Sequence, residues 1–195
     1  MAPVWQYATV CSSNMNRSME AHFQMAKAGL KVRSFGTGAQ VRLPGPSQDK
    51  PNVYEFGTAY SYILKDLRRK DEHLYKQNGL IYMLERNVTV KTAPERWHDM
   101  DKKEAFDVVF TYEARVFDGV LQELQGRESE TFWGVHVINL ETKDNHEEAV
   151  ISAKLTVKLC EMLEGLEDLE RDIVRVCDEF QAATKRPLIY SLVYI

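Results

Sequence analysis

Short apolar runs typical of strands alternate along this chain with longer amphipathic stretches typical of helices. The opening residues predict a strand over 4–10, a helix over 15–28 that ends at Gly29, and a second strand over 30–35. This order predicts a βαβ unit, with two parallel strands joined by a right-handed connection. The chain is therefore expected to begin as an α/β fold.

The same alternation continues through the second half of the chain. It predicts helices over 58–74 and 80–86, a strand over 106–111, a helix over 113–124, a strand over 135–140, helices over 146–163 and 166–182, and a closing strand over 188–194. Such alternation indicates one doubly wound, mostly parallel sheet with helices on both faces. No linker or internal repeat divides the chain, so we expect a single domain over residues 1–195.

Residues 36–57 interrupt the alternation with a long stretch that has neither a strand nor a helix pattern and contains Pro44, Pro46 and Pro51. Loops this long are uncommon in compact domains and often form lids or binding loops, although a plain surface insertion is the alternative. We expect an insertion over about 39–103 whose loop and helices bind substrate.

Composition and charge remove several classes of protein. Hydrophobic residues make up 44 % of the 195 residues, which is enough for a core, yet no apolar run approaches the ~20 residues of a membrane helix. The net charge of −4 does not indicate a nucleic-acid-binding domain. The first residues lack the basic and apolar regions of a secretory signal, and three cysteines do not indicate a disulfide scaffold, so a reducing compartment is expected.

The most informative segment runs from Cys11 to Arg17 and Ser18. It is predicted to join the carboxyl end of the first strand to a helix, which is where open α/β folds bind ligands. The amides of the intervening residues can turn toward an anion. These residues are Ser12, Ser13, Asn14, Met15 and Asn16. The segment therefore predicts a phosphate-binding loop with a nucleophile at its base.

The residue types in this loop suit phosphoryl transfer through a phosphocysteine. A helix N-terminus and the loop amides would stabilise Cys11 as a thiolate, and Arg17, one turn into the helix, would bind two phosphate oxygens. The Ser18 hydroxyl could donate to the thiolate and help it leave. A lone cysteine at a strand end is more often buried packing, and Cys160 and Cys177, in helical patterns without metal-ligand spacing, are interpreted in that way.

The reaction also needs a general acid, because a serine or tyrosine oxygen leaves poorly unless it is protonated. Asp144, which follows the predicted strand over 135–140, is the candidate acid, and His146 is the second candidate. Asp144 could instead be the N-cap of the next helix, a position that aspartate favours. Both interpretations of Asp144 remain open.

The loop resembles that of low-molecular-weight protein tyrosine phosphatases, which share its cysteine, the asparagine three residues later and the Arg-Ser pair. Much more of the chain resembles one eukaryotic branch of that fold, the phosphatases of the RNA polymerase II carboxyl-terminal domain. The matching segments are VCSSNMNRSMEAH, VRSFGTG, LPGP, DKPNVYEFGT, LYKQNGL, MLERN, PER and DNHEEA. They keep their order from about residue 8 onward.

The resemblance implies a phosphatase of low-molecular-weight tyrosine phosphatase-like fold that needs neither metal nor cofactor. Its implied substrate is phosphoserine in the heptad Tyr-Ser-Pro-Thr-Ser-Pro-Ser, chiefly the fifth-position serine followed by a cis proline, with activity also on the seventh. It implies a nuclear role in transcription and messenger RNA 3′-end processing, with a symplekin-type scaffold as partner and no binding of membrane or nucleic acid.

The resemblance also implies roles for particular residues. Cys11 would be the nucleophile, Arg17 the phosphate ligand and Asp144 the general acid. Peptide contacts are implied at Arg42, Leu43, Pro44 and Met83. Because prolines stiffen residues 42–46, we expect this segment and the apolar stretch at Met83 to form the walls of a narrow groove that leads to the cysteine.

Three positions depart from the expected pattern. Arg42 stands where lysine is usual, Glu141 replaces an aspartate before the acid, and Asn145 replaces the proline of the tyrosine phosphatases. The alternative functions are a general tyrosine phosphatase, which Asn145 and the long insertion disfavour, and a catalytically silent scaffold of the same fold. A thiol-dependent arsenate reductase would need a second cysteine near the loop, and residues 12–159 contain none.

Overall fold

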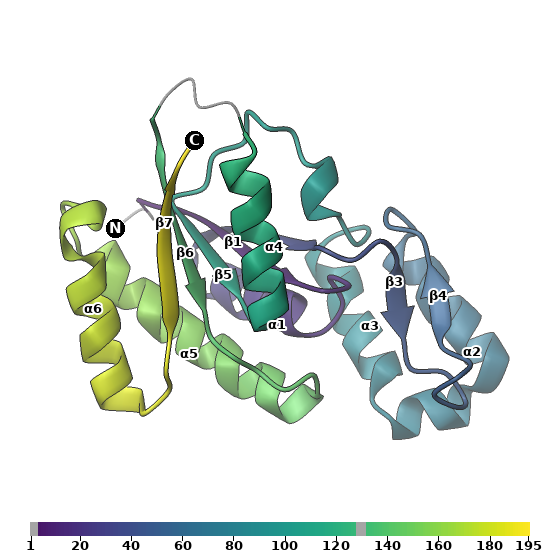
Figure 1. The fold of residues 1–195 in the computed structure, drawn as a ribbon. Helices are drawn as coiled ribbons and strands as arrows, with labels where there is room; N and C mark the ends of the chain where they lie inside the picture. The colour runs from purple at the N-terminus through teal and green to yellow at the C-terminus, as the bar shows by residue number, and fades with distance from the viewer. Residues whose placement is uncertain (1–3, 128–131) are drawn as a thin grey trace.

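The computed structural model describes residues 4–127 and 132–195. Residues 1–3 and 128–131 of the predicted domain, including the start of the N-terminal segment considered above, lie outside the described residues. The main sheet has five strands in the order β2-β1-β5-β6-β7 (Figure 1). The strands are β1 (Gln6–Cys11), β2 (Lys31–Gly36), β5 (Val108–Thr111), β6 (Gly134–Asn139) and β7 (Ile189–Tyr194). Only β7 among them pairs antiparallel, against β6, which confirms the mostly parallel sheet.

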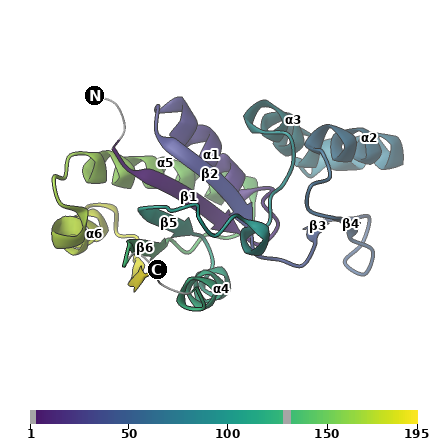
Figure 2. The same cartoon turned by 90° about the horizontal axis from the view of Figure 1, so that it is seen from above.

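Helices cover both faces of this sheet, as the alternating pattern predicts (Figure 2). The helices on one face are α1 (Arg17–Lys27), α5 (His146–Glu164) and α6 (Leu169–Thr184), and α4 (Ala114–Gln125) lies on the other. Successive residues of a strand point to opposite faces. Val108 and Phe110 accordingly pack into the core beneath α1, α5 and α6, while Val109 packs into the core beneath α4.

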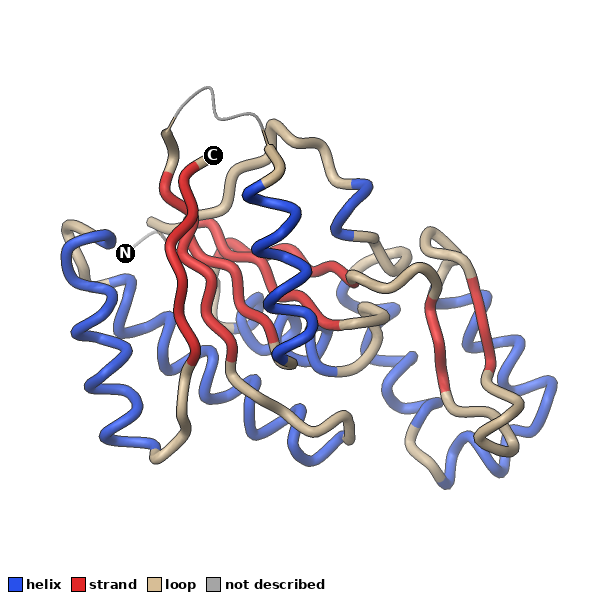
Figure 3. The backbone as a smooth tube through the Cα atoms, in the orientation of Figure 1, coloured by secondary structure: helices blue, strands red, loops and turns tan. Residues whose placement is uncertain are grey.

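The inserted segment folds beside the main sheet (Figure 3). Its elements are β3 (Val41–Leu43), β4 (Asn52–Tyr54), α2 (Tyr60–Gln77) and α3 (Leu80–Val90). The expectation that residues 36–57 lack regular structure is wrong, because β3 and β4 pair as a short antiparallel hairpin. Val41 and Leu43 are buried with residues of α2 and α3 in a third hydrophobic cluster. Strands of three residues among prolines are too short to show a two-residue period.

Several element boundaries also differ from the predicted ones. The first helix begins at Arg17, two residues later than predicted, so Arg17 is its first residue and does not lie one turn inside it. Asn16 is the N-cap of this helix, and the loop before it includes Asn14, whose φ of 53° lies in the left-handed region. α3 continues to Val90, and a short 3-10 helix over Trp97–Asp99 was not predicted.

The architecture brings the carboxyl ends of β1, β5 and β6 to one end of the sheet, beside the inserted segment (Figure 1). Loops from those ends therefore meet one another and the inserted helices there. Among the helices of residues 4–127 and 132–195, none is both long and apolar enough to cross a lipid bilayer.

Candidate active site

Cys11 ends β1 and pairs in register with Gly36 of β2. Its side chain is buried, and its Sγ lies 3.0 Å from the hydroxyl oxygen of Ser18, in the first turn of α1. Residues 12–16 connect the strand to the helix. The structure thus places the predicted nucleophile and the predicted hydroxyl donor in direct contact, with the loop running between them.

Two glycines, the last residue of β2 and the residue two positions later, make room for this loop. A Cβ on Gly36 would lie 2.7 Å from the carbonyl oxygen of Ser12 and 2.9 Å from the amide nitrogen of Asn14. The Gly38 amide donates to the Ser12 carbonyl at 2.9 Å. The chain at the end of β2 therefore needs glycine, because a side chain there would collide with the backbone of the loop. Backbone hydrogen bonds from the same stretch hold one side of the loop in place.

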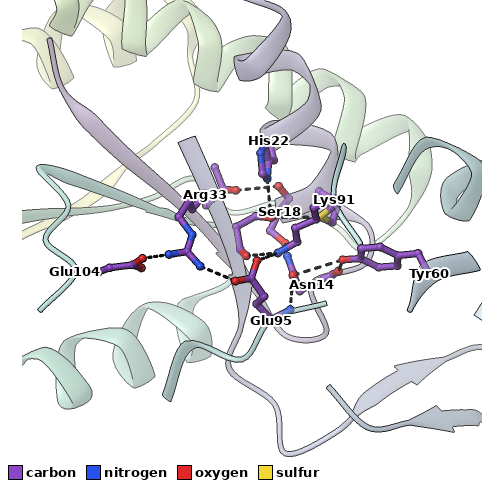
Figure 4. Close-up of polar contacts among 11 residues, drawn as sticks. Asn14, Ser18, His22, Arg33, Tyr60, Lys91, Glu95 and Glu104 are labelled. Carbon is purple, nitrogen blue, oxygen red and sulfur yellow. Dashed lines mark hydrogen bonds and ion pairs between the residues drawn. The ribbon is translucent and has the colours of Figure 1, made fainter. Parts of the chain in front are cut away.

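Asn14 organises the centre of the loop (Figure 4). Its side-chain Nδ2 donates to the Ser18 hydroxyl oxygen at 3.0 Å, and its Oδ1 accepts from the Glu95 backbone N–H at 3.0 Å. The Tyr60 hydroxyl donates to the Asn14 carbonyl oxygen at 2.6 Å. When Cys11 is a thiolate, which can only accept, the Ser18 hydroxyl accepts from Asn14 and donates its own proton to the sulfur. Sequence reasoning assigned no role to Tyr60 or to Glu95, although Glu95 lies in the matching segment PER.

Arg17 is oriented by groups from two other loops. Its guanidinium donates to the Glu113 carboxylate at 2.9 Å and to the Thr142 carbonyl oxygen at 3.1 Å. Its Nε is buried, makes no hydrogen bond and lies 3.5 Å from the Asp144 carboxylate. Burial lowers the pKa of Arg17, but the neighbouring Cys11, Asp144 and Glu113 outweigh it and raise the pKa above its ordinary value. The guanidinium is thus a fixed, charged group with a free N–H donor.

Asp144 is not the cap of α5, so that interpretation is wrong. The N-cap is Asn145, whose side chain accepts from the Glu148 N–H at 2.9 Å. The Asp144 carboxylate instead accepts from the Asn16 side chain at 2.9 Å, and 63 % of the side chain is exposed. The residue after Asp144 therefore caps the helix and leaves the carboxylate at the loop.

Glu141, one of the departures from the expected pattern, connects two loops of the site. Its Oε2 accepts from the Ala114 backbone N–H and from the Asn139 side chain, both at 3.1 Å. Ala114 is the first residue of α4 and directly follows Glu113, which orients the guanidinium of Arg17. The glutamate thus ties the loop that carries Asp144 to the segment that positions the arginine.

A cavity of about 240 Å³ lies over the loop and collects most of the predicted site residues. Predicted residues in its lining are Cys11, Ser12, Ser13, Met15, Asn16, Arg17, Arg42, Leu43, Pro44, Met83, Asp144 and His146. Asn14 and Ser18 are absent from the lining and support the loop from behind. Sequence reasoning missed Asn78, Gly79 and Leu80, although Asn78-Gly79 is visible as a break between two helices.

The inserted segment supplies the apolar side of this cavity. Leu43 and Met83 are mostly buried and belong to the third hydrophobic cluster, and both line the cavity with Pro44. The Ser13 hydroxyl oxygen accepts from the Arg42 N–H at 3.1 Å, which ties β3 to the loop. The expected juxtaposition of residues 42–44 with Met83 is therefore present in the fold.

α3 also holds the loop from the side of the insertion. Arg86 and Asn87 both donate to the Met15 carbonyl oxygen at 2.9 Å, and Arg86 forms a buried ion pair with Glu20 of α1. Turning the Met15 carbonyl toward α3 keeps its partial negative charge away from a bound anion. Neither Arg86 nor Asn87 was singled out from the sequence.

Neither a candidate metal centre nor an exposed thiol accompanies this site in the described residues. Within residues 4–127 and 132–195, no group of three or more His, Cys, Asp or Glu side chains is arranged to hold a metal ion. Cys160 of α5 and Cys177 of α6 are buried in the core, and burial raises the pKa of both thiols, that of Cys177 to about 11. Their interpretation as packing residues agrees with this placement.

Comparison with known proteins identifies the family. The model of the Ssu72-like protein family matches residues 5–195. The RNA polymerase II C-terminal domain phosphatase SSU72 of Danio rerio is 48 % identical over 187 residues, which cover 96 % of this chain and 95 % of that protein.

Solved structures of similar sequence lead to the same family. The serine phosphatase of the RNA polymerase II C-terminal domain (CTD) from Drosophila melanogaster is 46 % identical, with a TM-score of 0.95 over 98 % of this chain and 100 % of that one. D. melanogaster Ssu72 with Symplekin, bound to a cis peptidomimetic phospho-serine-5 CTD peptide, is 44 % identical, with a TM-score of 0.94 over 99 % of this chain and 100 % of that one. The chain therefore belongs to the Ssu72-like protein family.

Proposed function

We propose that the chain is a cysteine-dependent protein phosphatase acting on phosphoserine-proline sites of the RNA polymerase II CTD, chiefly the fifth-position serine of the heptad. The observation that carries the proposal is the meeting of Cys11, Arg17 and Asp144 in one cavity, with Ser18 in contact with the cysteine. Relatives bear the name of a CTD phosphatase, and the fly relative binds a cis peptidomimetic phospho-serine-5 peptide.

In the proposed first step the Cys11 thiolate attacks phosphorus while Arg17 binds the equatorial phosphate oxygens. The bond between phosphorus and the serine oxygen breaks, and Asp144 gives its proton to that oxygen. In the second step Asp144 removes a proton from water, which attacks the phosphocysteine. The thiolate leaves with the Ser18 hydroxyl as its hydrogen-bond donor, and inorganic phosphate is released.

The test of this function is phosphate release from matched phosphoserine-proline and phosphotyrosine peptides, with and without EDTA. We expect hydrolysis of the phosphoserine-proline peptide that EDTA leaves unchanged. Preference for phosphotyrosine would instead favour a general tyrosine phosphatase. A clear loss of rate with EDTA would contradict the cysteine mechanism, and no turnover of either peptide would favour a silent scaffold.

We expect Asp144→Asn to slow hydrolysis of the phosphoserine peptide by about 10²–10⁴-fold, because the serine alkoxide leaves only when protonated. An activated aryl phosphate, whose leaving group departs as a stable anion, should lose less than about tenfold. Asparagine retains an oxygen that can accept from the Asn16 side chain, so the contact at that position can persist. Equal losses on the two substrates would argue against a proton-transfer role.

The groove accounts for a preference for cis proline. Pro44 is held by its carbonyl oxygen, which accepts from the Asn52 side chain at 3.0 Å, and it faces the same cavity as Met83. A stiff wall would block an extended trans Ser-Pro peptide, whereas a cis bond reverses the chain and lets both ends leave the groove.

Single-turnover kinetics test this preference at high enzyme concentration. We expect a fast phase limited to the cis fraction, ~10–30 % of free peptide, followed by a slow phase over tens of seconds or more. A prolyl isomerase should remove the slow phase. Single-phase hydrolysis that neither the isomerase nor Met83→Ala affects would refute the proposal that the groove selects the cis form.

The remaining proposals concern the setting of the enzyme. A role in transcription and messenger RNA 3′-end processing would have the enzyme work in the nucleus, and the fly relative has been solved with Symplekin, which supports a symplekin-type scaffold as partner. We infer one phosphatase domain in which the inserted segment, residues 39–103, contributes the peptide-binding wall.

A further inference from the structure

Outside the cavity lining, a cluster of ion pairs lies behind the phosphate loop (Figure 4). Lys91, directly after α3, donates to the Glu95 carboxylate at 2.7 Å and to the Ser34 carbonyl oxygen at 2.6 Å. Arg33 of β2 pairs with the other oxygen of Glu95 at 2.5 Å and also pairs with Glu104. The Glu95 side chain is thus held by two cations from different elements.

The backbone of Glu95 connects this cluster to the loop. Its carbonyl oxygen accepts from the Gly36 N–H at 2.9 Å, and its own N–H donates to Asn14 Oδ1 at 3.0 Å. Asn14 in turn donates to Ser18 (Figure 4). The Ser18 hydroxyl contacts the Cys11 thiol. A continuous path of contacts therefore runs from the side chain of Lys91 to the thiol.

The direction of the hydrogen bonds along this path depends on the Asn14 amide. A backbone N–H can only donate, so the Glu95 N–H keeps the amide oxygen on its own side and the amide NH₂ toward Ser18. If the amide turned over, Ser18 would have to donate to the amide oxygen. The Cys11 thiolate would then lose its hydroxyl donor.

We propose that Lys91 and Glu95 are positioning residues: their ion pair holds the Glu95 peptide against Asn14 and thereby keeps the Ser18 hydroxyl turned toward Cys11. The proposal rests on the proposed phosphatase function. Lys91 directly follows α3 and so belongs to the inserted segment. Under this proposal the inserted segment supports the thiolate in addition to forming a wall of the groove.

A direct effect of charge makes a different prediction from positioning. If charge alone acted through space on Cys11, removing the Lys91 cation would raise the pKa of the thiol and removing the Glu95 anion would lower it. If positioning acts, both substitutions raise the pKa, because each loosens the same hydrogen-bond path. The sign for Glu95 therefore separates the two explanations.

Other groups around the cluster set the conditions of the test. Lys91 interacts electrostatically with Glu95 and Arg33. The positive charge of Lys91 also acts on the imidazole of His22 in α1. Burial lowers the pKa of Lys91 to about 8, although Glu95 opposes the shift, and burial together with Lys91 lowers the pKa of His22 to about 4. Between these values the lysine is charged and the histidine is neutral.

The experiment measures the rate of Cys11 alkylation by iodoacetamide against pH in the full chain, with the modified peptide identified by mass spectrometry. The variants are Lys91→Met, Lys91→Arg and Glu95→Gln. The matched control is Lys76→Met, which removes an ion pair of 3.0 Å to Glu72 between two exposed side chains of α2. Thermal unfolding of each variant is followed in parallel.

We expect Lys91→Met and Glu95→Gln each to raise the pKa for alkylation by about half to one unit, which slows alkylation three- to tenfold below that pKa. Lys91→Arg should restore most of the rate, and Lys76→Met should match the wild type. In phosphatase assays we expect kcat to fall with little change in KM, because the cavity lining is untouched.

A lower or unchanged alkylation pKa in Glu95→Gln would overturn the proposal, as would a fall in thermal stability without any change in the pH profile. Alkylation needs no substrate, so this result stands apart from the proposed function. Wild-type protein that hydrolyses no phosphopeptide would refute the function, whereas the variants' pH profiles decide the positioning role.

Discussion

Cys11→Ser is expected to abolish phosphatase turnover, with a loss of about 10⁴-fold or more, while the protein folds and still binds phosphopeptide. A serine hydroxyl is not ionised near neutral pH, so it cannot replace the thiolate as the attacking group. The substitution is nearly isosteric, and the new hydroxyl can hydrogen-bond with Ser18, which lies 3.0 Å from the present sulfur. Rates should be measured with the phosphoserine-proline peptide, and binding by calorimetry.

The control for Cys11→Ser is Cys177→Ser, which changes a cysteine on the buried face of α6. It should keep turnover per folded molecule, although it buries a hydroxyl in an apolar cluster and should lower the unfolding temperature. Trapping of a phosphoenzyme after acid quench should occur in the wild type and the control alone. Substantial turnover by Cys11→Ser would exclude the phosphocysteine intermediate.

Arg17→Ala is expected to weaken phosphopeptide binding and to slow turnover by about 10²–10³-fold, equivalent to about 2.7–4 kcal/mol in the transition state. The guanidinium is buried and already oriented by Glu113 and Thr142, so its charge is in place at the cavity before a phosphate binds. Its removal also breaks the ion pairs of Arg17 with Glu113 and Asp144, although Arg115 still pairs with Glu113 at 3.2 Å. Both binding and rate should be followed.

Arg17→Lys separates charge from geometry. Lysine keeps the positive charge but lacks the planar fork that binds two oxygens, so part of the binding should return while most of the rate loss persists. Thermal unfolding controls for the loss of the Glu113 ion pair. Near wild-type activity of Arg17→Ala would show that the phosphate is bound elsewhere.

Local patterns of hydrophobic residues were sufficient to predict the mostly parallel central sheet and the helices that cover its two faces. The strand–helix–strand opening places Cys11 at the carboxyl end of β1. The residues from Ser12 to Ser18 follow it directly in the chain, so they lie close to its side chain. The hairpin of β3 and β4 was missed because its pairing is too short to leave a periodic signal. Its formation depends on burial of Val41 and Leu43 against the inserted helices.

The choice between two roles for Asp144 also lay beyond the local pattern. Aspartate and asparagine both favour the N-cap, so adjacent Asp144 and Asn145 could not be separated by preference alone. The folded loop makes Asn145 the cap and turns the carboxylate toward the side chain of Asn16, 128 residues earlier. That contact depends on how the loops after β1 and β6 meet.

The sequence by itself determined which residues we propose for the chemistry, because the spacing from Cys11 to Arg17 and the switch from strand to helix are properties of one short segment. Only the tertiary structure decided what supports that segment. Glu95 reaches Asn14 through the inserted segment, and Glu113 reaches Arg17 through the loop after β5. Such contacts join loops whose paths are set by the packing of whole elements, and no local period of hydrophobic residues records them.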